Sequence, residues 1–234
     1  MKVYYAFHCV SQMSELAYLN IESLYDDLRK RYPNGQDVGT DNYLRCYAAI
    51  KDLQNTYVVR SPIDFRLSLD YDNQNIDCDR DPQFVSNYFN FEGLGALMFG
   101  PRTYLFSEEP LTVTQQPAYF HDTPYSDGYF AVTASFDISK WFRPNLCALL
   151  NKDLDDKKKG FEVKRGDPLY YLKFNTEESV EVENFSMNDK LIKYSKDCHT
   201  LKETFLNQRL SKVYSMFTHR NYNKKIMKEI RREL

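Results

Sequence analysis

The expected fold follows from two stretches, Thr56-Tyr-Val-Val-Arg60 and Ile63-Asp-Phe-Arg-Leu-Ser-Leu-Asp-Tyr71. Apolar and polar residues alternate along them, which is the pattern of β-strands with one buried face. Further strand-like segments follow at residues 96–99, 102–106, 111–114, 128–137, 145–150, 160–164, 168–174 and 179–185. Short strands at this spacing are typical of antiparallel folds rather than of alternating βαβ units. The sequence therefore predicts an antiparallel β-sandwich or jelly-roll core over residues 56–185.

The residues before this core are expected to form one strand and two helices. The strand is predicted at residues 2–10, and a short helix within residues 42–53. A longer helix is predicted from Ser14, a capping residue, to Tyr32, where Pro33-Asn34-Gly35 ends it. Its apolar residues recur at helical spacing, at Ala17, Ile21, Leu24 and Leu28.

Helical periodicity returns after Phe185. The apolar residues that share one face are Leu206, Leu210, Val213 and Phe217, followed in a second helix by Ile226, Ile230 and Leu234. An isolated basic helix is not stable in water, so this face must dock on its own chain or on a second copy. The connection is short, which favours docking within the chain, and a homodimer is the alternative. We predict a single α+β domain comprising residues 1–55 (strand and N-terminal helices), 56–185 (β core) and 186–234 (C-terminal amphipathic helices).

Charge is distributed unevenly along the 234 residues. The chain has a net charge of −2, whereas residues 186–234 contain 12 Lys or Arg against 5 Asp or Glu. Those residues therefore carry +7, and residues 1–185 carry −9. A basic tail on an acidic body indicates an internal electrostatic fit or an anionic partner. Repulsion from the acidic body argues against nucleic acid as that partner.

The composition indicates an intracellular protein without a membrane span. Apolar residues make up 42% of the chain, and no run of about 18 of them occurs. The first nine residues lack the apolar run and the cleavage site of a signal peptide. The cysteines are odd in number and widely spaced, which is typical of reduced thiols. They are Cys9, Cys46, Cys78, Cys147 and Cys198.

The sequence contains no recognisable catalytic, metal or cofactor motif. His8-Cys9 and Cys198-His199 are adjacent pairs, whereas zinc ligands usually come in spaced pairs such as CxxC. A GxSxG elbow, a phosphate-binding loop and the spaced histidines of an iron site are all missing. We therefore predict no metal, no cofactor and no catalytic residue, and favour a protein that is not an enzyme.

The loop Tyr119-Phe-His-Asp-Thr-Pro-Tyr125 is the first candidate for a pocket or an interaction site. It places an imidazole at His121, a carboxylate at Asp122 and a phenol at Tyr125. Such a loop could supply an acid–base group that a carboxylate orients. The alternative interpretation is a surface loop in which Asp122 and Thr123 form a turn.

The second candidate is Phe136-Asp-Ile-Ser-Lys-Trp-Phe-Arg-Pro144, which contains the single tryptophan, Trp141. Trp141 and Arg143 could stack on a planar ligand, and Arg143 could bind a carboxylate. The alternative interpretation makes Trp141 a core residue and places Arg143 at the edge of the core with its charge in water.

The segment Phe161–Phe174 predicts a hairpin, because Gly166 can adopt the positive φ that its turn requires. Its strand–Gly-Asp–strand pattern resembles a turn of cupin-like jelly rolls and of trimeric dUTPase-type folds. The chain lacks the clustered histidines of cupins and the nucleotide-binding motifs of dUTPases, so this resemblance implies no catalytic residue.

A broader resemblance is to accessory proteins of tailed phages. It rests on Ser61-Pro-Ile-Asp64, the segment 136–144, Arg165-Gly-Asp-Pro168 and the helical tail. The resemblance implies a phage-encoded protein in the cytoplasm of an infected bacterium or in the virion. No activity comes with it.

Three functions follow as hypotheses. The first is a non-catalytic accessory protein that binds a host factor or a virion component, and the 19 tyrosines would suit such an interface. The alternative is a jelly-roll enzyme or sensor for nucleotides or sugars, with a pocket near His121 and Arg143. Only an analogy of fold supports this alternative. The third is nucleic-acid binding through interleaved basic and aromatic residues of the tail, such as Arg209, Lys212, Tyr214 and Lys224. The acidity of residues 1–185 argues against it.

Overall fold

Strand pairing divides the β-strands into three sheets. The computed structural model describes residues 1–7, 21–32, 44–91, 95–153, 155, 158–204 and 209–234. Sheet 1 has the order β14 (Glu181–Asn184), β1 (Lys2–Phe7), β7 (Ala96–Phe106), β11 (Asn145–Asn151) and β9 (Tyr129–Ala131), and β6 (Phe89–Phe91) also pairs with β7. Sheet 2 has the order β10 (Ala134–Asp137), β8 (Thr112–Gln116), β13 (Pro168–Phe174), β3 (Thr56–Arg60) and β2 (Glu22–Ser23). Sheet 3 consists of β12 (Lys158–Val163), β4 (Phe65–Asp70) and β5 (Asn75–Cys78).

Six helices accompany the sheets in the described part of the chain. They are α1 (Leu24–Arg31), α3 (Tyr47–Gln54), α4 (Pro82–Tyr88), α5 (Asp189–Thr204), α6 (Leu210–His219) and α7 (Tyr222–Glu233). The described strand pairs are antiparallel, except that β1 runs parallel to β14. The predicted α+β class with antiparallel sheets is therefore confirmed.

Alternation along each strand sends neighbouring side chains into different layers. On β1, Tyr5 lies in the main core, whereas Tyr4 faces the opposite side of sheet 1. On β13, Tyr170 lies in the same main core, whereas Tyr171 faces the opposite side of sheet 2. The main core thus lies between the inner faces of sheets 1 and 2, and it continues over sheet 3.

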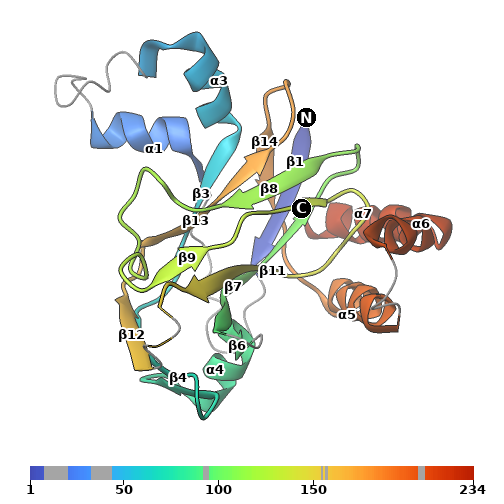
Figure 1. The fold of residues 1–234 in the computed structure, drawn as a ribbon. Coiled ribbons are helices and arrows are strands. Elements are labelled where there is room, and N and C mark those ends of the chain that lie inside the picture. The colour runs from blue at the N-terminus through green and yellow to red at the C-terminus, as the bar shows by residue number, and fades with distance from the viewer. Residues whose placement is uncertain (8–20, 33–43, 92–94, 154, 156–157, 205–208) are drawn as a thin grey trace.

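Helices pack on the outer faces of both sheets, and on sheet 1 they cover part of that face (Figure 1). Leu24 and Leu28 of α1 and Leu53 of α3 pack on Val58 and Tyr171 of sheet 2. Helices α5–α7 pack on sheet 1, at the other side of the molecule. The buried side chains of this second interface include Tyr104, Phe106, Trp141 and Phe142 from the sheet side, and Leu191, Val213, Phe217, Ile226 and Ile230 from the helices.

The first helix is shorter at its start than the sequence pattern predicts. Ser14 lies outside the described residues, and Ile21 precedes a short strand, β2. The observed cap is Ser23, whose hydroxyl accepts a hydrogen bond from the Asp26 backbone N–H at 3.1 Å. Leu24 and Leu28 occupy one buried face, as their spacing indicates.

Gly166-Asp167 does not connect two paired strands, so the predicted hairpin is wrong. β12, before the turn, pairs with β4, and β13, after it, pairs with β3. The Gly166 N–H donates to the Ser61 carbonyl at 2.8 Å, and the Ser61 N–H donates to the Asp167 carbonyl at 2.9 Å. Gly166 does adopt a positive φ, 90°. The turn carries the chain from sheet 3 to sheet 2, beside the place where β3 leads into β4.

Two further expectations need correction. Residues 128–137 form two strands, β9 and β10, which belong to sheets 1 and 2. The segment after the turn at residues 71–74 contains β5 and α4, which periodicity did not predict. Asp81 caps α4 by accepting the Phe84 N–H at 2.9 Å, and Pro82 occupies its first turn. Asp81-Pro82 is a helix-start signal that short-range apolar patterns do not contain.

Candidate functional site

A buried hydrogen-bond network surrounds His121, at the interface between α1 and sheet 2. His121 Nε2 lies 2.8 Å from Asp27 Oδ2, and Nδ1 forms a short hydrogen bond with the Tyr171 hydroxyl. Arg60 of β3 forms an ion pair with the other oxygen of Asp27. The Phe120 backbone N–H donates to the Tyr171 oxygen at 3.2 Å. Helix α1, β3, β13 and the loop after β8 thus meet at one cluster, the Asp27 network (Asp27, Arg60, His121 and Tyr171).

The charge on Asp27 determines the direction of its hydrogen bond with His121. Burial raises the pKa of Asp27, but the hydrogen bond from His121 and the charge of Arg60 outweigh burial and hold it below 3.8. An ionised carboxylate only accepts hydrogen bonds, so His121 donates from Nε2 to Asp27. The second ring nitrogen, Nδ1, is hydrogen-bonded to the Tyr171 hydroxyl.

The Asp27 network is therefore complete, and it leaves His121 no free nitrogen. The His121 side chain is 3% exposed, and that of Asp27 is 8% exposed. A general base needs access to the proton it removes. In this arrangement the histidine instead fastens α1 and the loop after β8 to the outer face of sheet 2.

The other two predicted residues of the same loop occupy different surroundings. Asp122 is exposed and accepts a hydrogen bond from the Ser126 hydroxyl at 3.1 Å. Tyr125 is buried in the main core, and its hydroxyl donates to the Leu169 carbonyl. Burial raises the pKa of Tyr125 far above its ordinary value, so this phenol stays protonated.

Trp141 and Arg143 lie on the other side of the molecule from the Asp27 network. Trp141 is buried under the C-terminal helices, with its ring centroid 6.2 Å from that of Tyr214. Arg143 is exposed at the edge of this interface. The five predicted residues therefore form no single site, because His121, Tyr125 and Trp141 belong to three separate clusters. Trp141 and Arg143 do lie near each other, beside Tyr214.

Sequence reasoning missed Asp27, Arg60 and Tyr171, the partners of His121. A signal for Asp27 exists in the sequence, because it lies between Leu24 and Leu28 on the apolar face of α1. An acidic residue on an apolar helical face must find a partner when it is buried. The identity of that partner, 94 residues further along the chain, is not contained in any local pattern.

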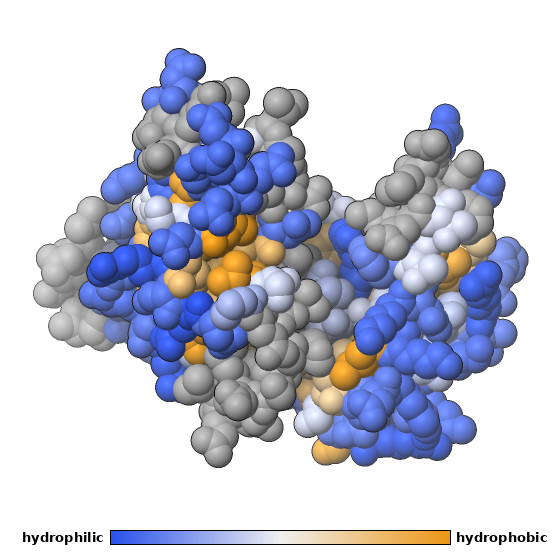
Figure 2. All heavy atoms as spheres, turned by 90° about the horizontal axis from the view of Figure 1, so that it is seen from below, coloured by the Kyte–Doolittle hydropathy of each residue, from blue (hydrophilic) through white to orange (hydrophobic). Residues whose placement is uncertain are grey.

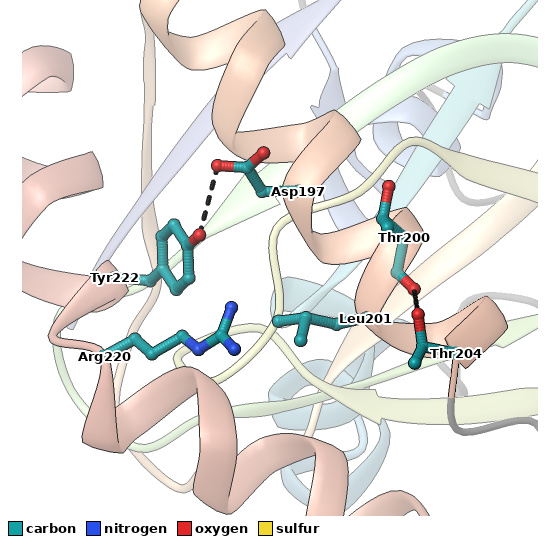
Figure 3. Close-up of a pocket in the computed structure, with 6 residues that line it drawn as sticks. All are labelled: Asp197, Thr200, Leu201, Thr204, Arg220 and Tyr222. Carbon is teal, nitrogen blue, oxygen red and sulfur yellow. Dashed lines mark hydrogen bonds between the residues drawn. The ribbon is translucent and has the colours of Figure 1, made fainter.

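A pocket opens between α5 and the start of α7 (Figure 3). Its volume is about 360 Å³, within the range of ordinary ligand sites. The Tyr222 hydroxyl donates to Asp197 at 3.1 Å along one wall. The complete lining is Asp197, Thr200, Leu201, Thr204, Arg220 and Tyr222. None of these residues belongs to the predicted site.

The surface also carries an apolar area on the outer face of sheet 1. Hydrophilic side chains cover most of the face in Figure 2, and apolar side chains form small groups between them. Phe130 of β9 and Leu150 of β11 are direct cross-strand partners, 59% and 43% exposed. Met98 and Ala148, paired with each other on the same face, are partly exposed. We call these four residues the sheet 1 patch.

Comparison with known proteins finds no matching family model, curated protein or solved structure. The described residues contain no group of three or more His, Cys, Asp or Glu side chains that could hold a metal ion. Among them there is also no helix with the length and apolar character that crossing a membrane requires. Functional conclusions therefore rest on the geometry of this chain.

Proposed function

We propose that the protein acts without catalysis, by binding another protein through the sheet 1 patch. The observation that carries this proposal is the exposed pair formed by Phe130 and Leu150. Helices α5–α7 cover one part of the outer face of sheet 1. The sheet 1 patch lies on the remaining part, which the helices leave exposed. Aromatic side chains are enriched at protein interfaces, where they supply most of the binding energy.

The position of β9 supports the same proposal. It is the last strand in the order of sheet 1, and within the described residues no further strand pairs with it. Lys152 places its ammonium 4.9 Å from the centre of the Phe130 ring, so a cation borders the apolar area. A partner could therefore add its backbone to the edge of the sheet and its apolar side chains to the face.

In the phage setting that the sequence resembles, the partner would be a host factor or a virion component. The proposed scaffold is a β-sandwich, of which a jelly roll would be one variant. The alternative enzyme or sensor, with a pocket near His121 and Arg143, has weaker support. His121 is buried with both nitrogens engaged, and Arg143 lies by another cluster.

Binding by the patch is tested with the double variant Phe130→Ser/Leu150→Ser as bait against extract of the bacterial host. The matched control is Tyr47→Ser on α3, a helix that packs on sheet 2 and carries an aromatic ring that is 82% exposed. We expect one protein to be retained by the wild type and the control and lost with the double variant. The retained protein, once purified, should bind the wild type in calorimetry with a negative heat-capacity change.

The same material distinguishes the remaining outcomes. Size-exclusion chromatography with light scattering shows whether the patch instead binds a second copy of the chain. Unfolding curves of the variants should match that of the wild type, because exposed substitutions change stability by only about 0.5 kcal/mol. Retention of the same proteins by the wild type and the double variant would contradict a binding role for the patch.

A further inference from the structure

The turn between α6 and α7 brings basic residues of two helices into one surface. Residues 209–228 contain six Lys or Arg and no Asp or Glu. Asn221, with φ of 55°, reverses the chain between the two helices in the left-handed conformation that asparagine tolerates. The last turn of α6 therefore lies beside the first turn of α7.

The apolar residues of these helices face the sheet, so the basic residues face outward. Val213, Phe217, Tyr222 and Ile226 are buried against sheet 1. The exposed side chains of the same segment are Arg209, Ser211, Lys212, Ser215, Thr218, His219, Arg220, Asn221, Lys224, Lys225 and Lys228. We call them the α6–α7 basic surface.

The pocket between α5 and α7 opens at this surface. Arg220 and Tyr222 line the pocket, and the Lys225 ammonium lies 5.5 Å from the centre of the Tyr222 ring. In Figure 3 the Arg220 guanidinium extends toward Leu201 and the Tyr222 hydroxyl reaches Asp197 on the facing helix. The pocket thus combines an apolar wall, a carboxylate acceptor and a cation at its edge.

The kind of partner follows from these side chains. Phosphate oxygens are contacted mainly by Arg and Lys, with Ser, Thr and Asn adding hydrogen bonds, and these residues compose the basic surface. Insertion into a lipid surface needs exposed large apolar residues. The large apolar side chains that are exposed in the described part of the chain all lie outside 209–228. A nucleic-acid backbone fits better than a membrane.

The pocket favours a single strand over a duplex. An unpaired base can enter a pocket at lower cost than a base in a duplex, which must first be unpaired and unstacked. Leu201 and the edge of the Tyr222 ring, whose face is stacked on Phe217, could contact such a base, and Asp197 could accept a hydrogen bond from its amino group. Arg220 at the edge would then hold the attached phosphate.

The negative charge of residues 1–185 does not cancel the positive charge of the α6–α7 basic surface. Arg231, near the end of α7, forms an ion pair with Glu108 at 2.6 Å, which places the end of that helix against the acidic body. Lys224 lies seven residues earlier, about 10 Å along the helix axis. Screening in about 0.1 M salt acts over about the same distance. The body therefore repels a bound strand only weakly at this surface.

We propose that the α6–α7 basic surface binds single-stranded nucleic acid, with one base in the pocket. This binding is separate from the protein contact proposed for the sheet 1 patch, and does not depend on it.

The test is fluorescence anisotropy of the full chain with a labelled single strand of about 20 nucleotides and with its duplex, because site sizes are below this length. The affinity should fall steeply between about 50 and 200 mM salt, and the single strand should bind more tightly than the duplex. Lys225→Gln/Lys228→Gln should lower the slope of log K against log salt by about one per lysine. The matched control is Lys164→Gln/Arg165→Gln, which removes two exposed charges from the turn after β12.

Thr200→Phe tests the pocket, because it introduces a large side chain at an exposed position of the pocket wall. We expect it to weaken single-strand binding severalfold and to leave duplex binding unchanged. Three results would overturn the proposal: no saturable binding of the oligonucleotide at low salt, equal effects of the lysine pair and its control, or binding of anionic vesicles or an acidic peptide in place of nucleic acid. Equal losses of single-strand and duplex binding with Thr200→Phe would overturn the role of the pocket.

Discussion

At the scale of single residues, the Asp27 network shows how a histidine that is prominent in the sequence can have both ring nitrogens engaged within the fold. Each polar atom that His121 presents has a partner, and the partners come from α1 and β13. A buried network in which every group is paired stabilises one arrangement of the backbone. Breaking one member leaves the others buried and unsatisfied.

Asp27 gives this network a defined pH dependence. Its pKa is lower in the folded protein than its ordinary value of 3.8, so its stabilisation is present above that value. The stabilisation is lost as the pH falls through the lower pKa of the folded state. We expect Asp27→Asn to reduce the free energy of unfolding by about 3 kcal/mol near pH 7, because Arg60 and His121 lose their partner. This difference from the wild type should shrink below about pH 4.

Urea unfolding of both proteins between neutral and acidic pH measures the difference. Asp122→Asn is the control, because that carboxylate is exposed. If the free energies of unfolding of the wild type and Asp27→Asn differ by a constant amount down to acidic pH, the lowered pKa assigned to Asp27 in the folded protein is wrong.

Cysteine reactivity gives a second prediction at the residue scale. The described cysteines are free thiols. Burial raises the pKa of Cys147 and of Cys198 to about 12, and both are inaccessible to reagents in the folded protein. We expect a thiol reagent at pH 8 to modify exposed Cys46 first and these two only on unfolding. Peptide mass spectrometry at successive times identifies the sites, and early labelling of Cys198 would mean that α5 detaches from sheet 1.

At the scale of elements, α7 shows how amphipathic spacing becomes a packing interface. Ile226 and Ile230 are four residues apart and fully buried against sheet 1. The Glu229 carboxylate beside them pairs with Arg232 at 2.6 Å, so the polar side of the helix is also satisfied. Apolar burial therefore holds this helix, with Arg231 and Glu108 as one ion pair to the body.

Truncation of one buried side chain should show this directly. Ile230→Ala is expected to lower the free energy of unfolding by about 2–4 kcal/mol, because it leaves a cavity where the side chain was fully buried. Leu234→Ala, at a residue that is 54% exposed, should change it by less than about 0.5 kcal/mol. Denaturant curves of the three proteins provide the measurement, and similar losses in the two variants would show that α7 is not anchored through Ile230.

At the scale of the whole molecule, sheets 1 and 2 share one core and helices pack on the outer face of each, leaving the sheet 1 patch exposed. The structure has α5–α7 on sheet 1 of the same chain, where the apolar face of Val213 and Phe217 is buried. The excess of basic residues in the tail remains on the outside, so the tail docks through apolar contacts more than through charge.

Removal of residues 200–234 should uncover the outer face of sheet 1. The exposed rings of Tyr104, Phe106 and Phe142 would then bind the dye ANS, and the product would aggregate. Trp141 is the single tryptophan and lies in this interface, so its emission should shift to longer wavelength. A truncated chain that stays monomeric with an unchanged melting temperature would show that the tail does not stabilise the body.

Local patterns in the sequence were sufficient for much of the secondary structure. Alternation located β4, whose side chains are alternately buried and exposed. The segment Thr56–Arg60 is also a strand, β3, but the prediction of one buried face is wrong for it, because α1 and α3 cover its outer side and both faces are buried. The spacing of Leu24 and Leu28 located the buried face of α1. The preference of glycine for positive φ located the turn at Gly166. Each of these properties depends only on residues that are close together in the sequence.

Tertiary structure alone decided which strands pair and which polar groups meet. The strands on either side of Gly166 belong to different sheets, because β3 and β4 offered each of them a partner about 100 residues earlier. His121 acquired Asp27 and Tyr171, and Trp141 became part of an interface with helices that follow much later. Periodicity predicts which face of a helix or strand is buried. Which other element covers that face depends on the packing of the whole chain.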